Sequence, residues 1–295
     1  DAQSVEEEDL RLWLGCKNPE ALPDILAVGL QEVDMSAKAL LMGTAKAEEW
    51  RKRLTRLAED CRMVSICSEQ MMGVWLFVAV HSNSHHIVSD VEVLSTPTGW
   101  FGIFGNKGGV LCRMRLDDKW YCFVNSHLAA HHGKVKARNA NYRDIRSNSV
   151  FRSVPYTPLT HDYVFWFGDL NYRIDLKKEL FQDLLTDEDC EALLCKDQLR
   201  KQIMEGAAFE VFQEADIQWT PTYKFKGDMY NEKRRPAYCD RVLSYERGVA
   251  QCALQCGCSK GGKPLCSECT VDAKLASLQY QSLREIDNSD HKPVF

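Results

Sequence analysis

Short apolar runs rich in Val, Phe and Trp recur along this chain, and they limit its possible folds more than any other feature. Their lengths and their β-branched and aromatic content are typical of strands. The runs are DILAVGL (24–30), VWLFVAV (74–80), VLCRMRL (110–116), WYCFVNS (120–126), DYVFWFGD (162–169) and DRVLSY (240–245). Between them, residues 36–59 and 176–204 carry Leu at near-helical spacing. Strands that alternate with helices predict a layered α/β architecture.

The composition is that of a folded globular domain. Hydrophobic residues make up 45% and charged residues 27% of the 295 residues, which is close to the average for such domains. No linker, repeat or low-complexity tract interrupts the chain, so we expect a single domain over 1–295 with a Cys-rich insertion at about 250–272. The net charge of −5 provides no bulk attraction to nucleic acid, so we expect no nucleic-acid partner.

Two features indicate the compartment. The chain has no apolar run long enough to span a membrane, and its first residues, DAQSVEEEDL, lack the pattern of a signal peptide. Its 13 cysteines are an odd number, spread through expected strands and helices, which suits reduced thiols better than a disulfide framework. We therefore expect a cytoplasmic protein.

Polar side chains gather where the expected strands end or begin, although each alone also suits a turn or a cap. They are Gln31, Glu32, Asn125, Ser126, His127, Asp169, Asn171, Asp240, Arg241, Asp290 and His291. The end of a rigid sheet can aim such groups into one pocket. Carboxylates, an Asn and imidazoles without a Ser or Cys nucleophile motif favour metal-assisted hydrolysis. Isolated oxygen ligands suit Mg²⁺ held together with a substrate phosphate, so phosphoester hydrolysis is the predicted reaction class.

Two strings, FWFGDLNYRID (165–175) and RRPAYCDRVL (234–243), resemble the signature motifs of the inositol polyphosphate 5-phosphatases. Supporting strings follow the same order as in that family: GLQEVDM (29–35), FGIFGNKGGV (101–110), NSHLAAH (125–131) and SDHKPVF (289–295). The resemblance implies the four-layered α/β sandwich of deoxyribonuclease I, in which two mixed β-sheets pack face to face and are flanked by helices.

The resemblance also implies roles for the strand-end residues in the first part of the chain. Glu32 would bind Mg²⁺, Asp169 would position or deprotonate the attacking water, and Asn171 would bind the scissile phosphate. His127 would be a further phosphate contact. The alternative for Glu32 is a solvated residue at the end of a strand. Family members also place an Asn on an earlier strand, whereas the first Asn here is Asn18, in an expected loop before Pro19.

In the last part of the chain, the resemblance implies a carboxylate and imidazole pair. Asp240 would hydrogen-bond His291 and favour its imidazolium, which would stabilise charge on the phosphoryl oxygens. Asp290 would lie beside the metal and the water. The alternative for Asp240 is a simple pair with Arg241.

Selectivity for inositol phosphates requires several converging donors, because one small ring carries several phosphates. The expected substrate-binding residues are Lys107, Tyr172, Arg173, Tyr223, Lys224, Lys233, Arg234, Arg235 and Arg241. By resemblance, Tyr223, Lys224 and Lys233 are expected to hold the 4-phosphate. The alternative for residues 233–235 is a solvated turn.

The Gly-rich segment 98–109 carries the expected lipid contacts Trp100, Phe101, Ile103 and Phe104. A loop with so many Gly residues buries large apolar groups poorly, so we expect this patch to enter a membrane surface. The alternative for Trp100 and Phe101 is a strand edge packed under the pocket. A second basic tract, Lys134, Lys136, Arg138, Arg143 and Arg146, either faces anionic lipid or covers a helix.

The Cys-rich insertion contains two close Cys pairs around a Gly turn: Cys256, Cys258, Cys266 and Cys269. This spacing resembles a small structural zinc site. The alternative is a flexible insertion with reduced thiols.

The sequence thus predicts an Mg²⁺-dependent phosphatase that removes the 5-phosphate from phosphatidylinositol 4,5-bisphosphate or 3,4,5-trisphosphate, and from soluble inositol polyphosphates. Its expected partners are phosphoinositides at a membrane surface, where it would bind peripherally. Two alternatives are a phosphodiesterase of the same fold, such as a nuclease or a sphingomyelinase, and a weakly active phosphoinositide-binding module.

Overall fold

The computed structural model describes residues 5–18, 22–33, 45–99, 106–152, 156–231, 233–250, 275–277, 279–286 and 289–295. Its contacts divide the chain into two compact units. Unit 1 contains residues 1–127 and 144–169, and unit 2 contains residues 128–143 and 170–295. The expectation of a single domain stays a prediction. Within the described ranges, no helix has both the length and the apolar character needed to cross a membrane.

The first sheet of unit 1 is antiparallel, with strand order β1-β3-β2. These strands are β1 (Ile25–Leu30), β2 (Met63–Met71) and β3 (Val74–His81). Every residue of β3 except the last is buried, which explains its continuous apolar run. β2 was not predicted from the sequence, because its bulge between Ser65 and Cys67 interrupts the two-residue alternation that marks a strand.

Three helices of unit 1 accompany this sheet: α1 (Glu7–Trp13), α3 (Ala45–Asp60) and α4 (Ser82–His85). The predicted helix over 36–59 agrees with α3. Its Leu54 and Leu57 are 0% exposed and pack in one core with Leu26 of β1 and Phe77 of β3. The apolar face of α3 therefore covers one side of the first sheet.

The second sheet contains β4 (Val88–Pro97), β5 (Gly108–Leu116), β6 (Lys119–His127) and β7 (Tyr163–Asp169) as neighbours in the order β7-β6-β5-β4. β6 and β7 are parallel, and the other pairs of this set are antiparallel. A parallel pair needs a long crossover, and helix α5 (Val135–Asn148) and the short 3₁₀ helix Pro158–Thr160 lie in it. Ile145 of α5 packs against Gly109 of β5.

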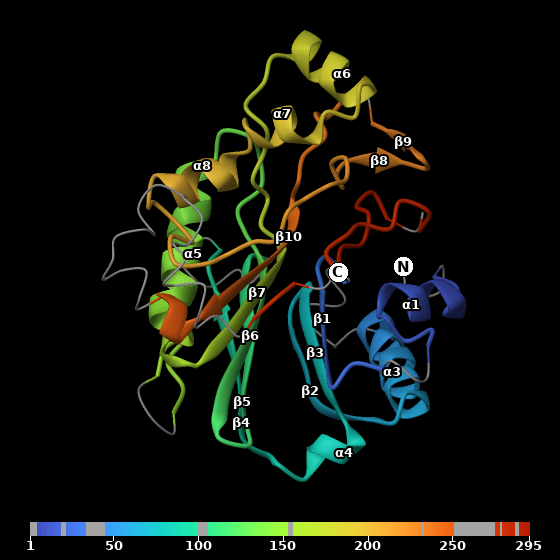
Figure 1. Ribbon diagram of the computed structural model, residues 1–295, viewed down its shortest axis with the longest axis vertical. Coiled ribbons are helices and arrows are strands. Elements are labelled where there is room, and N and C mark those ends of the chain that lie inside the picture. The colour runs from blue at the N-terminus through green and yellow to red at the C-terminus, as the bar shows by residue number, and fades with distance from the viewer. Residues whose placement is uncertain are drawn as a thin grey trace. The chain divides into compact units, whose positions relative to one another are not determined.

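The two sheets of unit 1 lie face to face, as Figure 1 shows, with contacts from β1, β2 and β3 to strands of the second sheet. The order helix, sheet, sheet, helix confirms the predicted layered α/β class, whereas the described strands of the first sheet are all antiparallel and do not form the predicted mixed sheet.

Unit 2 contains α6 (Lys178–Thr186), α7 (Cys190–Leu194), α8 (Gln198–Met204), β8 (Phe225–Lys226), β9 (Met229–Tyr230) and β10 (Asp240–Glu246). The helical spacing over 176–204 thus belongs to three short helices. Asp189 is the N-cap of α7 and Asp197 is the N-cap of α8. Asp189 Oδ1 accepts from Ala192 N–H and Asp197 Oδ1 accepts from Arg200 N–H, both at 3.0 Å, so each side chain starts its helix.

Candidate functional site

The first candidate group lies where three strands of unit 1 end. Glu32 lies two residues beyond β1, His127 ends β6 and Asp169 ends β7. His127 and Asp169 are partners in the parallel register, so both side chains leave the sheet at one edge. His127 Nε2 lies 3.2 Å from Asp169 Oδ2 and 4.0 Å from Glu32 Oε1. The structure therefore brings these three predicted site residues together.

Asn125 fixes the ends of β1 and β6 relative to each other. It is 0% exposed, and its Nδ2 donates to the carbonyl oxygens of Leu30 at 3.1 Å and Trp75 at 2.8 Å. Gln31 Nε2 donates to Asn125 Oδ1 at 2.6 Å. Leu30 and Gln31 directly precede Glu32, so Asn125 fixes the backbone from which the Glu32 side chain extends. Sequence reasoning placed Asn125 at a strand end but assigned it no role.

Two glycines make room for the Asn125 amide. A Cβ on Gly29 would lie 2.5 Å from Asn125 Cγ, and a Cβ on Gly168 would lie 2.5 Å from Asn125 Oδ1. Gly168 also has a φ of +121°, which L side chains rarely adopt. Gly168 is therefore required both by its backbone conformation and by the close approach of Asn125.

Lys107 determines which nitrogen of a neutral His127 carries the proton. Lys107 Nζ lies 3.4 Å from His127 Nδ1, and a lysine ammonium can only donate. Nδ1 is then the acceptor, so the ring hydrogen lies on Nε2, which faces Asp169. Burial lowers the pKa of Lys107, while the charges of Asp169 and Glu32 oppose that shift.

The donor set of unit 1 fits Mg²⁺, which binds one or two carboxylates and keeps several waters. The Glu32 side chain is 69% exposed, and Glu32 has a left-handed φ of +57° at the bend after β1. Across the described residues, no three His, Cys, Asp or Glu side chains gather closely enough to form an all-protein metal cage. A hydrated Mg²⁺ on Glu32 needs no such cage.

The second candidate group lies in unit 2, around His291. His291 Nδ1 lies 2.9 Å from Asp240 Oδ2 and 3.1 Å from Asp240 Oδ1, and Thr222 Oγ1 donates to Asp240 Oδ2 at 2.8 Å. An Nδ1–H that donates to this carboxylate leaves Nε2 as the second proton site. The Tyr223 ring lies 4.8 Å from the His291 ring.

Backbone pairing brings the segment 222–225 together with two motifs of unit 2. Tyr223 N–H donates to Ala237 O at 3.2 Å, and Ala237 N–H donates to Tyr223 O at 2.8 Å. On the other side of this segment, Phe225 N–H donates to Asp290 O and Lys292 N–H donates to Thr222 O, both at 2.9 Å. The segment 222–225 therefore lies between the PAYCD and SDHK strings.

The predicted phosphate contacts of unit 2 differ in their surroundings. Arg173 lies 4.3 Å from the Tyr223 ring centroid and donates from Nε to Asn171 O at 3.1 Å and from Nη2 to Asn171 Oδ1. Lys224 forms an ion pair with Asp290, and this hydrogen bond raises the pKa of Lys224. Lys233 and Arg234 are exposed.

Two predicted substrate contacts are wrong, because their polar atoms face the interior of unit 2. The Arg241 side chain is 0% exposed, with Nη1 2.9 Å from Asp197 Oδ1 and Nη2 2.5 Å from Glu214 Oε2. The alternative pairing of Asp240 with Arg241 is therefore also wrong. Tyr172 is 0% exposed and donates from Oη to Asn139 Oδ1 at 2.7 Å.

Arg138 does not belong to a lipid-facing basic tract, because it is 0% exposed and bound to backbone carbonyls. Two predicted groups lie outside the described residues. They are the apolar side chains Trp100, Phe101, Ile103 and Phe104, and the cysteines Cys256, Cys258, Cys266 and Cys269.

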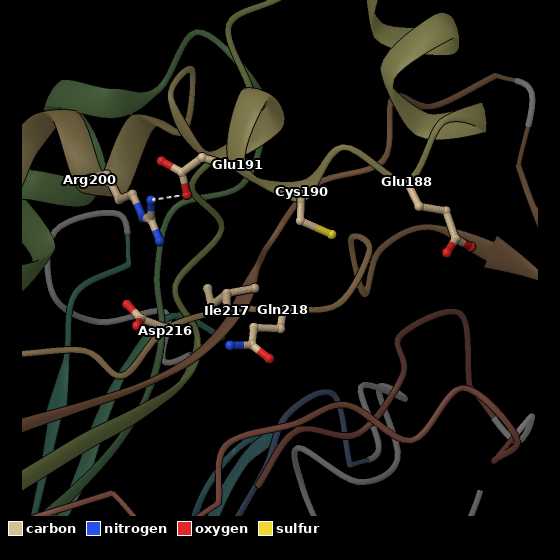
Figure 2. Close-up of a pocket in the computed structure, with 7 residues that line it drawn as sticks. All are labelled: Glu188, Cys190, Glu191, Arg200, Asp216, Ile217 and Gln218. Atoms are coloured by element: carbon tan, nitrogen blue, oxygen red, sulfur yellow. Dashed lines mark ion pairs between the residues drawn. The ribbon is translucent and has the colours of Figure 1, made fainter.

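A cavity of about 440 Å³ lies elsewhere in unit 2. Its lining contains Glu188, Cys190, Glu191, Arg200, Asp216, Ile217 and Gln218. Figure 2 shows the ion pair between Arg200 and Glu191 in this lining. Arg200 Nη1 lies 3.6 Å from Glu191 Oε2. The lining has three carboxylates and one guanidinium, so its net charge is negative and it repels a polyphosphate. This cavity therefore does not suit a phosphorylated substrate, and it contains none of the predicted site residues.

Comparison with known proteins gives one consistent family. The model of endonuclease/exonuclease/phosphatase family 2 matches residues 2–295. The chain is 34% identical over 301 residues to mouse type II inositol 1,4,5-trisphosphate 5-phosphatase, and 33% identical over 291 residues to human synaptojanin-2. These matches cover 98% and 92% of this chain but only 28% and 19% of those proteins.

A solved structure agrees with these sequence matches. It is the inositol polyphosphate 5-phosphatase domain of SPsynaptojanin in complex with inositol (1,4)-bisphosphate and a calcium ion. The match has a TM-score of 0.80 and 32% identity, and it covers 99% of this chain and 78% of the chain in that structure. The chain therefore belongs to endonuclease/exonuclease/phosphatase family 2 and, within it, to the inositol polyphosphate 5-phosphatase family.

Proposed function

We propose that this protein is an Mg²⁺-dependent phosphatase that removes the 5-phosphate from inositol polyphosphates and phosphoinositides. The observation that carries the proposal is the meeting of Glu32, His127 and Asp169 at one edge of the sheets in unit 1. This group offers an exposed metal-binding carboxylate beside a carboxylate and imidazole pair. Similarity to proteins named inositol 1,4,5-trisphosphate 5-phosphatase and synaptojanin supports the substrate class.

The proposed roles in unit 1 follow from charge and hydrogen-bonding capacity. Asp169 accepts a proton from the attacking water or orients it, and His127 Nε2–H contacts a phosphate oxygen. Lys107 holds the tautomer of His127 and adds positive charge. Mg²⁺ on Glu32, when bound, would neutralise charge on the phosphoryl oxygens.

In unit 2, the Asp240 carboxylate favours a His291 imidazolium whose Nε2–H donates to the phosphoryl group. Arg173, Lys233 and Arg234 are proposed to bind the other ring phosphates. Lys224 is proposed to exchange its ion pair with Asp290 for one with the 4-phosphate, since Asp290 and the phosphate are both anions.

Phosphate release from inositol 1,4,5-trisphosphate, with Mg²⁺ and with a chelator, tests the reaction. Asp169→Asn should lower kcat by about 100-fold or more, whereas Asp183→Asn on the exposed face of α6 should leave it unchanged. Cleavage of nicked DNA in place of phosphate release would favour the phosphodiesterase alternative. Binding of phosphoinositide without turnover would favour the binding module.

Lys224→Ala and Lys233→Ala test the 4-phosphate contacts. Each should reduce hydrolysis of substrates that carry a 4-phosphate far more than of substrates that lack it, because only the former lose a charge-assisted contact. Equal losses on both substrates would place these lysines elsewhere.

Membrane contact through Trp100, Phe101, Ile103 and Phe104 is part of the proposal. The double change of Ile103 and Phe104 to Ser should reduce hydrolysis of phosphoinositide in vesicles while leaving the soluble substrate unaffected. Parallel loss on both substrates with a lower melting temperature would indicate packed side chains instead. Zinc binding by Cys256, Cys258, Cys266 and Cys269 is tested by metal analysis of the purified protein.

A further inference from the structure

The buried side chain of Gln198 connects the start of α8 to the segment that carries Arg173. Gln198 is 3% exposed and is the first residue of α8, after its N-cap Asp197. Its backbone N–H donates to Arg173 O at 2.8 Å, and its Oε1 accepts from Arg173 N–H at 3.0 Å. Gln198 thus holds the peptide groups on both sides of Arg173 and fixes the backbone direction there.

Arg138 of α5 holds Gln198 from the other side. The 0% exposed Arg138 donates from Nη2 to Gln198 Oε1 at 2.6 Å. Its Nη1 donates to the carbonyl oxygens of Ala129 at 3.0 Å and His131 at 2.7 Å. One guanidinium therefore ties the loop after β6 to the amide that holds Arg173.

Gln198 uses its whole hydrogen-bonding capacity in this network. Its Nε2 donates to Asp175 Oδ1 at 2.8 Å and to His132 O at 3.3 Å, while its Oε1 accepts two bonds. A primary amide has two N–H donors and two acceptor lone pairs. Any rotation of the amide would break its bond to the buried Arg138 guanidinium together with its other bonds, which is costly, so its orientation is fixed.

Arg173 connects this hydrogen-bond network to the second candidate group. Its side chain donates to Asn171 and lies 4.3 Å from the Tyr223 ring centroid, and that ring lies 4.8 Å from His291. A displaced Arg173 backbone would move the guanidinium that faces these residues.

We propose that Gln198, held by Arg138, is a positioning residue that orients the Arg173 guanidinium towards a phosphate of the substrate. The inference rests on the proposed function, because it assigns Arg173 a phosphate contact. Phosphoryl transfer depends chiefly on positioning and charge stabilisation. A planar guanidinium binds phosphate through two parallel N–H donors, so its orientation decides how well it binds. Gln198 acts through Arg173 and does not touch the substrate.

Gln198→Met tests the proposal, because Met has nearly the same shape without the amide. Gln202→Met is the matched control, since Gln202 lies on the same helix, is 8% exposed and bonds to Asn139 and Glu205 instead. The kcat/KM for inositol 1,4,5-trisphosphate should fall by about 10-fold to 100-fold in Gln198→Met. It should fall by less than about 3-fold in Gln202→Met, although both changes remove buried hydrogen bonds.

A double-mutant cycle separates positioning from a general structural role. In an Arg173→Ala background, Gln198→Met should lower kcat/KM by less than about 2-fold more, because the group that it positions is already gone. Losses that simply multiply would refute action through Arg173. If Gln198→Met does not fold, Arg138→Lys replaces it, since Lys keeps the charge but lacks the fork that reaches Gln198 and the loop carbonyls together.

A spectrum of the ligand-free protein tests the same claim without activity. The Nε–H resonance of Arg173, identified by its loss in Arg173→Ala, should shift in Gln198→Met and stay in place in Gln202→Met. An unshifted resonance in Gln198→Met would overturn the proposal. If the unmodified protein releases no phosphate, the proposed function fails, while this spectrum still decides whether Gln198 orients Arg173.

Discussion

Replacing Asn125 by Ala removes the amide that joins the two sheets of unit 1 beside the candidate site. The change deletes two donor bonds to the carbonyl oxygens of Leu30 and Trp75 and one acceptor bond from Gln31. Each bond contributes about 1 kcal/mol net, and buried carbonyls left unpaired cost about 1–3 kcal/mol. We expect the free energy of unfolding to fall by about 3–5 kcal/mol, which is a large part of the ~5–15 kcal/mol of a typical domain.

Urea unfolding, followed by circular dichroism, measures this loss. Asn83→Ala is the control, because Asn83 is exposed on α4 and such changes usually stay within about 0.5 kcal/mol. Folded Asn125→Ala should also release phosphate more slowly than the unmodified protein, because Leu30 and Gln31 lead directly to Glu32. A loss of stability below about 1 kcal/mol would refute the view that this amide joins the sheets.

Asn125→Asp adds a test in which the sign of the pH dependence is fixed. The new carboxylate oxygen would face the two carbonyl oxygens that Asn125 Nδ2 now binds, and burial raises the pKa of such a carboxyl. The folded state then binds more protons than the unfolded state above the ordinary carboxyl pKa. The variant should therefore regain stability relative to the unmodified protein as the pH falls from about 7 to 5. A pH-independent difference would count against this reasoning.

Three further outcomes follow from other buried groups, each measured by urea unfolding. Burial lowers the pKa of His161, so the folded state binds fewer protons than the unfolded state below about pH 6.5, and the free energy of unfolding should fall from pH 7 to 5. His161→Asn should remove this contribution to the pH dependence of stability, and an unchanged pH dependence would contradict the reasoning. Arg241→Met should cost about 3–5 kcal/mol, because it leaves Asp197 as an unpaired buried charge; a neutral effect would mean that the pair does not stabilise the fold. Gly168→Ala should cost about 3 kcal/mol or more, because the φ of +121° is strained for Ala and the new Cβ would lie 2.3 Å from Ser126 O; a cost near zero would show that the backbone adapts.

The sequence predicted the strands better than the helices. The apolar run 74–80 agrees with β3, because a strand covered on both faces reads as continuous apolar sequence. The run 162–169 agrees with β7. The bulge in β2 broke its alternation. The Leu spacing over 176–204 did not show where α6, α7 and α8 begin, because single capping side chains decide those boundaries.

In the candidate site too, the sequence predicted some features and not others. Glu32, His127 and Asp169, which the structure brings together, were singled out from the sequence because chemistry-bearing residues stand out at the ends of apolar runs. Tyr172 and Arg241 were assigned wrongly as substrate contacts, since adjacency to a motif does not tell which way a side chain points. Both side chains turn into the interior of unit 2, where buried polar partners satisfy them.

The sequence by itself determined the α/β class, the family motifs and the residue types that the proposed chemistry needs, because strand periodicity and local motifs depend on neighbouring residues. Only the tertiary structure decided that His127 and Asp169 are register partners, that Asn125 joins β1 to β6, and that Gln198 holds Arg173. These contacts join residues far apart in the chain. Their hydrogen bonds form only when distant segments are packed and shielded from water, so no local pattern records them.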